Sequence, residues 1–174
     1  MGLGAAGRTA GRRPLKLVLA SVGRLKAGPE RELFERYSKR AAVLAGAAGL
    51  TSVSFREIDE GKARDLDERR AAEGKVLADV AGKGAWICAL DERGTALTSE
   101  GWAQEIAKAR DAGQGTYAIV IGGPDGIDPE LRRAARSTLA FGSLTWPHQM
   151  VRVLAAEQIY RCLTILTGHP YHRA

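Results

Sequence analysis

Residues 116–126 have the sequence Thr-Tyr-Ala-Ile-Val-Ile-Gly-Gly-Pro-Asp-Gly, a hydrophobic run followed by a glycine-rich turn. The run from Thr116 to Ile121 predicts a strand covered on both faces, because such a strand needs no alternation of polar and apolar side chains. Gly122 and Gly123 follow directly, where a ligand can approach the backbone with no side chain in the way. In open α/β sheets ligands bind at the carboxyl ends of the strands, so this turn is a candidate binding loop. A tight turn that binds nothing is the alternative.

Strand and helix signals alternate on both sides of this stretch. Helix starts are marked by proline at the first helical position, by an acidic first turn and by capping side chains. These signals predict helices that start at Pro29, near 65, at 98–100, at 128–130 and at Pro147. Strands are expected over 15–20, around 53–55, and over 85–90, 116–121 and 138–145. The alternation predicts an α/β fold, with a mostly parallel sheet and helices on both faces.

The chain has the length of one ordinary domain, at 174 residues. We expect residues 1–14, rich in glycine, alanine and arginine, to form a disordered extension, and residues 15–174 to form a single domain. Gly2-Leu3-Gly4-Ala5-Ala6-Gly7 matches the dinucleotide-binding pattern, but the strand that this motif requires does not precede it. The start of the chain lacks the apolar centre of a secretory signal, and no apolar run reaches the roughly 18 residues that span a bilayer.

The two cysteines and the net charge indicate where the protein is located and what kind of partner it binds. Cys88 and Cys162 lie in apolar surroundings, which is typical of reduced core thiols, and we expect a cytoplasmic protein without membrane contact. The net charge of +6 and the pI near 9.6 favour a polyanionic partner such as nucleic acid. Basic loops are often only solvated, but six side chains are candidate phosphate contacts: Arg24, Lys26, Lys62, Arg64, Arg132 and Arg133.

All three histidines fall in the closing segment that starts at Trp146. His169 and His172 are a poor metal pair, because no nearby Cys or carboxylate completes a ligand set and Pro170 breaks the helical spacing. Nor does Gly-Lys-Ser or Gly-Lys-Thr follow the glycine loop, which disfavours a nucleoside triphosphate. His148 alone is ordinarily structural. Its combination with a terminal Tyr-His-Arg indicates a site that handles protons.

The final predicted helix, from Pro147 to about Thr167, is apolar around much of its circumference. A helix of this kind is buried on more than one side. We expect the sheet on one side and a second subunit on the other, with burial inside one domain as the alternative. Glu157 and Arg161 are spaced for an i,i+4 ion pair, and Arg152 is a further polar exception.

The chain resembles the ribosomal RNA large subunit methyltransferase H family of SPOUT-class knotted methyltransferases. The resemblance runs from about Leu15 to the carboxyl end and is most specific in the last 60 or so residues. It rests on five motifs: Ile-Gly-Gly-Pro-Asp-Gly at 121–126, Leu-Thr-Trp-Pro-His at 144–148, Val-Arg-Val-Leu at 151–154, Ala-Glu-Gln-Ile-Tyr-Arg at 156–161 and His-Pro-Tyr-His-Arg at 169–173.

The resemblance implies a trefoil knot near the carboxyl end, a homodimer, and methyl transfer from S-adenosylmethionine to the N3 of a pseudouridine in large-subunit ribosomal RNA. It implies no metal. It places nine residues at the cofactor: Leu90, Gly122, Gly123, Phe141, Gly142, Ser143, Leu144, Thr145 and Trp146. The last of these, Trp146, departs from the family's usual Leu or Phe, a change expected to tighten the pocket.

The resemblance also implies that four residues face the substrate base: His148, Tyr171, His172 and Arg173. The N3 of pseudouridine is an imide nitrogen and must lose a proton before it attacks. A cation near the carbonyl groups stabilises the resulting anion, which suits Arg173. Either His172 or His148 is the proton acceptor.

Two other functions are compatible with the sequence. One is a knotted methyltransferase that acts on transfer RNA, and the other is a ribosome-associated binding module without activity. The second explains the positive charge but gives the glycine loops and histidines no purpose. For the ribosomal function, we expect the assembled ribosome to be required, because so small a domain has little surface with which to recognise an RNA hairpin alone.

Overall fold

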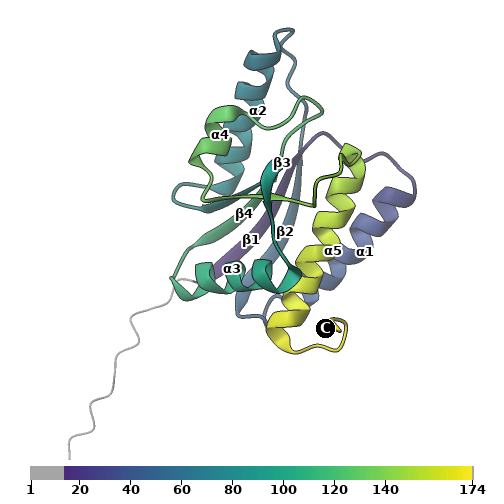
Figure 1. Cartoon of the computed structure of the whole chain (residues 1–174), viewed down its shortest axis with the longest axis vertical. Helices are drawn as coiled ribbons and strands as arrows, with labels where there is room; N and C mark the ends of the chain where they lie inside the picture. The colour runs from purple at the N-terminus through teal and green to yellow at the C-terminus, as the bar shows by residue number, and fades with distance from the viewer. Residues whose placement is uncertain (1–13, 174) are drawn as a thin grey trace, which may run out of the picture.

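Five parallel strands form one sheet in the order β2-β1-β4-β3-β5 (Figure 1). The computed structural model describes residues 14–173. The strands are β1 (Leu15–Val22), β2 (Leu50–Ile58), β3 (Trp86–Ala96), β4 (Thr116–Ile121) and β5 (Ser137–Ala140). The helices are α1 (Pro29–Leu44), α2 (Leu66–Ala81), α3 (Ser99–Asp111), α4 (Pro129–Ala134) and α5 (His148–Thr167). The predicted α/β fold, with strands and helices in alternation, is confirmed.

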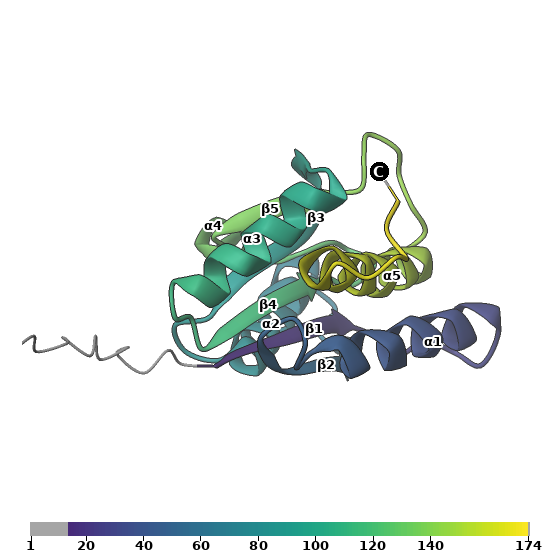
Figure 2. The same ribbon diagram turned by 90° about the horizontal axis from the view of Figure 1, so that it is seen from below.

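Helices cover both faces of the sheet, as Figure 2 shows. Successive side chains of a strand point to opposite faces, and β1 follows this rule. Leu17 and Leu19 pack in the core cluster that contains residues of α1, α3 and α5, whereas Ala20 and Val22 pack with Leu77 of α2 and with α4. The continuous apolar runs in the sequence therefore correspond to strands buried on both sides.

Helix α5 lies against α1 and α3 on one of these faces. Val153, Ile159 and Leu163 are fully buried inside the chain, so burial within one domain explains much of its apolar character. Four of its other apolar residues are only partly buried and fall within about 100° of one another around the helix: Met150, Val151, Leu154 and Ile165.

The expected strand over 138–145 is wrong in its second half. Strand β5 ends at Ala140, and residues 141–147 form a loop. Gly142 has a φ of +89°, in the region that favours glycine, and its conformation ends the strand. The strand expected over 85–90 instead continues to Ala96, with a register shift between Leu90 and Thr95. Both differences lie at the carboxyl edge of the sheet.

Other features of the described residues bear on the expected location and on the thiols. Between residues 14 and 173, no helix is both long and apolar enough to cross a membrane. Cys88 and Cys162 are free and buried. Burial raises the pKa of the Cys88 thiol to about 11 and raises the pKa of Cys162 as well. The extension expected over residues 1–14 lies outside the described part of the chain, except for Pro14.

Candidate functional site

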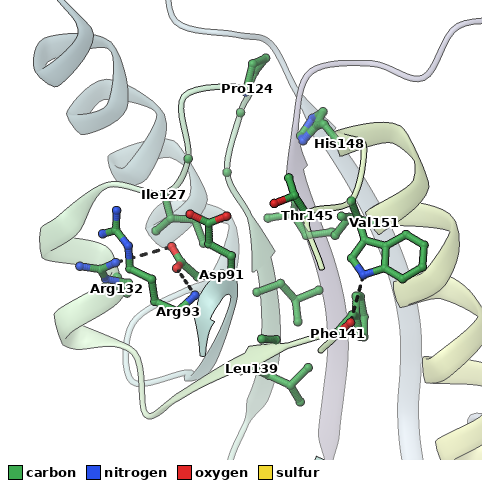
Figure 3. Close-up of a pocket in the computed structure, with 18 of the residues that line it drawn as sticks. Asp91, Arg93, Pro124, Ile127, Arg132, Leu139, Phe141, Thr145, His148 and Val151 are labelled. Atoms are coloured by element: carbon green, nitrogen blue, oxygen red, sulfur yellow. Dashed lines mark hydrogen bonds and ion pairs between the residues drawn. The ribbon is translucent and has the colours of Figure 1, made fainter. Parts of the chain in front are cut away.

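A cavity of about 470 Å³ opens at the carboxyl edge of the sheet. Its walls come mainly from the second half of β3 and from the loops that follow β4 and β5, close to the position at which ligands bind in open α/β sheets. Figure 3 shows Asp91, Arg93 and Arg132 on one side of this space, and Thr145, His148 and Val151 on the other. The cavity therefore has a charged side and a more apolar side.

The glycine loop after β4 folds back on itself. The amide of Gly126 donates to the carbonyl of Gly123 over 2.9 Å, and Gly126 has a φ of +90°. A Cβ atom at Gly122 would lie 2.5 Å from both the carbonyl carbon and the oxygen of Gly126, a distance that real structures do not show. Backbone thus packs directly on backbone, and the loop cannot keep this shape with a side chain at 122.

Gly123 leaves little space for a side chain, for a different reason. Its backbone lines the cavity, but a Cβ there would lie 3.1 Å from the Glu73 carboxylate and 3.2 Å from Val22. Glu73 is buried and accepts a hydrogen bond from the amide of Gly61, so it has little room to yield. A larger residue at 123 would therefore first displace helix α2, and would act on the cavity only indirectly.

The loop over 141–147 forms the opposite wall and is closed by its tryptophan. The indole N–H of Trp146 donates to the carbonyl of Phe141 over 3.0 Å, which ties the two ends of the loop together. Leu144 and Trp146 are 69% and 40% exposed and form an apolar rim at the cavity mouth. Eight of the nine residues expected at the cofactor line the cavity. The exception is Ser143, which lies in the loop but not on the wall.

The charged side of the cavity was only partly indicated by the sequence. Arg132 was expected as a phosphate contact, but its guanidinium lies 3.7 Å from the Asp91 carboxylate at the cavity wall. Asp91 also accepts from the amide of Arg93 over 2.9 Å. Asp125 is paired with Arg69 at 2.7 Å. The sequence does show charged residues directly after the buried run 86–90, but their pairings can be seen only in the structure.

The other candidate phosphate contacts lie on the surface. Arg24 is paired with Asp59 at 2.9 Å, and Arg133 lies 3.9 Å from Glu130. Each of these pairs is well exposed to solvent, where ion pairs contribute little. Lys26, Lys62 and Arg64 are also exposed. Nothing in their geometry distinguishes an RNA contact from a solvated side chain.

His148 is the first residue of α5 and lines the cavity. Its Nε2 lies 3.0 Å from the carbonyl oxygen of Val22 and 2.6 Å from Nη2 of Arg152, one helical turn later. Burial and the neighbouring Arg152 charge lower the pKa of His148. The ring is therefore neutral near neutral pH.

The terminal residues pack at the other end of α5. The Tyr171 ring lies 4.6 Å from the Tyr160 ring and 4.9 Å from the Arg161 guanidinium, and its hydroxyl donates to Glu157 over 3.0 Å. Burial and the hydrogen bonds of its hydroxyl raise the pKa of Tyr171. The predicted pair of Glu157 and Arg161 is present at 2.7 Å.

His172 contacts the amino end of α3. Its Nε2 lies 2.7 Å from a carboxylate oxygen of Glu100, while its Nδ1 is buried without a partner. The pKa of Glu100 is lowered by its own backbone N–H and by His172. Arg173 is exposed. Within the described residues, no three His, Cys, Asp or Glu side chains are grouped as a metal site would require.

One chain does not bring the four expected base-facing residues together. His148 starts a helix of 20 residues, which is about 30 Å long, and Tyr171 follows the far end of that helix. Only His148 lines the cavity. The structure therefore divides the closing segment into two clusters, which we call the cavity cluster (His148, Arg152 and Val22) and the tail cluster (Tyr160, Tyr171, His172, Glu100 and Glu157).

Comparisons with known proteins show which family the chain is similar to. The family model described as predicted SPOUT methyltransferase matches residues 15–172. Proteins named ribosomal RNA large subunit methyltransferase H are similar throughout. The one from Beijerinckia indica is 49% identical over 92% of this chain and all of its own length, and the one from Chelativorans sp. is 50% identical over 91% of each chain.

A solved structure is more remotely similar. The SpoU methyltransferase AviRb from Streptomyces viridochromogenes has a TM-score of 0.40 and 14% identity, over 90% of this chain and 62% of its own. The family match and the curated relatives both extend over almost the whole described chain. The protein therefore belongs to the SPOUT methyltransferases and, among them, to the ribosomal RNA large subunit methyltransferase H family.

Proposed function

We propose that this protein transfers a methyl group from S-adenosylmethionine to the N3 of a pseudouridine in large-subunit ribosomal RNA. The observation that carries the proposal is the cavity at the carboxyl edge of the sheet, with glycine backbone on one wall and His148 at its rim. The curated relatives are named as methyltransferases of large-subunit ribosomal RNA. The choice of pseudouridine N3 rests on the terminal motif at 169–173 and its resemblance to the family.

The size and the charge of the cavity suit S-adenosylmethionine. Its volume of about 470 Å³ lies within the usual range for small-molecule sites. Arginines and carboxylates line it in equal number, so their formal charges cancel. This balance fits a ligand that carries both charges better than it fits a polyphosphate. The lining residues concerned are Arg70, Arg93, Arg132, Asp91, Glu92 and Asp125.

The residues of the chain must orient the base and accept its proton. When bound, S-adenosylmethionine would supply an electrophilic methyl group and a neutral thioether leaving group. The imide proton would pass to a base on the protein before the nitrogen attacks, and the sulfur of the cofactor would leave as the thioether. Arg173 would stabilise the anion on the carbonyl oxygens, and His148 or His172 would contact the ring. Catalysis is then mainly a matter of orientation.

A homodimer would bring the two clusters together. The tail cluster of one copy cannot reach the cavity of the same copy along a helix of about 30 Å, but it can face the cavity of a second copy. The partly buried apolar side of α5, described above, is available for that contact. We infer that each complete site combines His148 of one subunit with the tail of the other, within the knotted arrangement that the resemblance implies.

Methylation of defined RNAs tests the proposal. The purified protein is incubated with methyl-labelled S-adenosylmethionine and whole ribosomes, free large subunits, naked large-subunit RNA or transfer RNA. We expect label in assembled ribosomes, at a position where primer extension stops, because an N3 methyl group blocks the base-pairing edge. Ribosomes that carry uridine in place of the pseudouridine are the matched substrate control, and they should remain unlabelled.

Each other outcome identifies an alternative. Label confined to transfer RNA would replace the ribosomal substrate with the transfer RNA one. Absence of S-adenosylmethionine binding by calorimetry, together with tight ribosome binding, would support a module without activity and overturn the proposal. Label in naked RNA as strong as in ribosomes would retain the reaction but contradict the need for the assembled particle.

A further inference from the structure

Arg152 is a buried cation directly behind the cavity. It is 2% exposed, and its guanidinium donates to the carbonyl of Gly23 over 2.8 Å and to the carbonyl of Val22. Its counter-charge is the carboxylate of Glu57, 3.4 Å away. Since arginine does not lose its proton in proteins, Arg152 is a permanent positive charge in this position.

The Nε2 atom of His148 has two neighbours with opposite demands. Nη2 of Arg152, 2.6 Å away, can only donate a hydrogen bond, and the carbonyl oxygen of Val22, 3.0 Å away, can only accept one. The Val22 carbonyl already accepts from Arg152, so it does not need the ring proton, whereas a proton on Nε2 would face the closer guanidinium donor. The arrangement that avoids two opposed donors leaves Nε2 as the acceptor and places the proton of the neutral ring on Nδ1, which has no partner among the described residues.

We propose that Arg152 is a positioning residue that fixes His148 as a neutral hydrogen-bond donor, with the proton on Nδ1. This inference deepens the proposed function and rests on it for the meaning of the donor. His148 then donates to a carbonyl or carboxylate oxygen in the cavity and does not accept the imide proton. Of the two histidines considered, that task falls to His172, whose Nε2 faces the Glu100 carboxylate.

The charges around His148 support this arrangement. Arg152 lies on its own helix, and its charge opposes protonation of the ring. The Val22 carbonyl and Glu60, which follows β2, act in the opposite direction, but burial and the Arg152 charge are larger and lower the pKa of His148. Glu57 on β2 and Arg31 on α1 face Arg152 and are themselves paired at 2.9 Å.

Imidazole ¹⁵N NMR of the free protein tests the proton position without cofactor or RNA. The His148 signals are identified by their loss in His148→Asn. In the unsubstituted protein we expect Nδ1 to be protonated and Nε2 to be unprotonated. A proton on Nε2 would overturn the proposal. Because no methyl transfer is measured, failure of the proposed function leaves this result unaffected.

Two variants of the same buried network give opposite expected shifts. Arg152→Lys removes the guanidinium fork and allows the charge to move away, so the His148 titration midpoint should rise. Glu57→Gln retains Arg152 but removes its counter-charge, so the midpoint should fall while Nδ1 keeps the proton. Amide spectra confirm that each variant is folded. A shift in the same direction in both variants would indicate general loosening and contradict the proposal.

Methyl-transfer rates then test the role of His148. An asparagine amide at 148 approximates the position of Nδ1, whereas a glutamine amide approximates Nε2. A donor role predicts that His148→Asn loses about tenfold in kcat and that His148→Gln loses at least about tenfold more. Equal losses of about 100-fold or more in both variants would identify His148 as the base and overturn the assignment.

Discussion

The two ends of helix α5 place a histidine in opposite electrostatic surroundings. At the first residue, His148 lies against the buried guanidinium of Arg152. Beyond the last residue, His172 lies 2.7 Å from the Glu100 carboxylate. A neighbouring cation keeps an imidazole neutral and leaves one nitrogen free to donate, whereas a neighbouring carboxylate accepts a hydrogen bond from the ring. The two histidines at the ends of this helix are thus suited to different tasks.

The two ends also differ in how they are built. The cavity cluster adjoins loops in which backbone packs on backbone, as at Gly122 and Gly126. The tail cluster is held largely by side chains, through the packed rings of Tyr160 and Tyr171 and the Glu157 hydrogen bond. The first arrangement excludes side chains, and the second depends on them. Substitutions in the loops beside the cavity cluster should therefore affect mainly cofactor binding, and changes in the tail cluster should affect mainly catalysis.

Deletion of the tail should have the largest effect. Removing residues 171–174 takes away Tyr171, His172 and Arg173, and we expect methyl transfer to fall by about 1,000-fold or more, because base and cation are lost together. S-adenosylmethionine affinity by calorimetry should change by less than about threefold, since no tail residue belongs to the cavity walls and the tail is assigned to the base. Removal of Ala174 alone is the control and should remain active. Full activity without the four residues would contradict the assignment of the tail.

Substitution of a single glycine should damage the other end. Gly122→Ala forces a Cβ to within 2.5 Å of Gly126 backbone atoms, and the loop must open. We expect S-adenosylmethionine affinity to fall by about 100-fold, which corresponds to roughly 2.7 kcal/mol. Gly115→Ala, at the start of the same strand, meets no atom within 4 Å and is the matched control. Equal affinities of the two variants would show that loop shape does not govern binding.

Loss of one hydrogen bond in the opposite cavity wall should lower S-adenosylmethionine affinity by a smaller factor. Trp146→Phe retains an aromatic ring but removes the donor to the Phe141 carbonyl, which ends the closure of the loop. One neutral hydrogen bond contributes about 1 kcal/mol, so affinity for S-adenosylmethionine should fall about fivefold. Trp102→Phe removes a buried indole donor to Tyr117 but keeps an aromatic ring beside Phe141, so the cavity wall is retained. That control should lower the melting temperature and leave affinity unchanged.

The smallest effect concerns stability in acid. The folded-state pKa of His148 is lowered, so its ring is neutral in both states above about pH 6.5. As the pH falls below that value, the unfolded chain takes up the proton first, and the free energy of unfolding decreases. His148→Gln should reduce this decrease between pH 7.5 and 5.5 by less than about 1 kcal/mol in urea unfolding. A larger decrease in the variant would show that the ring is not held neutral.

The sequence predicted the elements well where the pattern was local. The apolar run at 116–121 and the proline start at Pro29 correspond to β4 and α1. The prediction of a strand over 138–145 was wrong in its second half, because the apolar residues Phe141 and Leu144 belong to a loop that lines the cavity. Hydrophobicity alone does not distinguish such a loop from a buried strand. Tertiary context overrides such local signals.

The expected site residues and their arrangement have to be judged separately. The nine expected cofactor residues came from the family resemblance, and eight of them line the cavity, but their role stays a prediction. Sequence proximity also suggested that His148 and His172 share one place, and the length of α5 separates them. The sequence showed Arg152 only as a polar residue in an apolar helix. The structure adds that the carbonyls of Val22 and Gly23 hold its guanidinium beside His148.

Because its two thiols are buried, the protein can be labelled selectively at a new surface cysteine. The chain has two cysteines, Cys88 and Cys162, and burial raises the pKa of both, so neither offers a reactive thiolate to a maleimide. Val43 on α1 is 83% exposed. A spin label attached through Val43→Cys would therefore occupy one position per chain without removal of either native cysteine. Dipolar spectroscopy on that labelled protein would then report the spacing between two copies in solution.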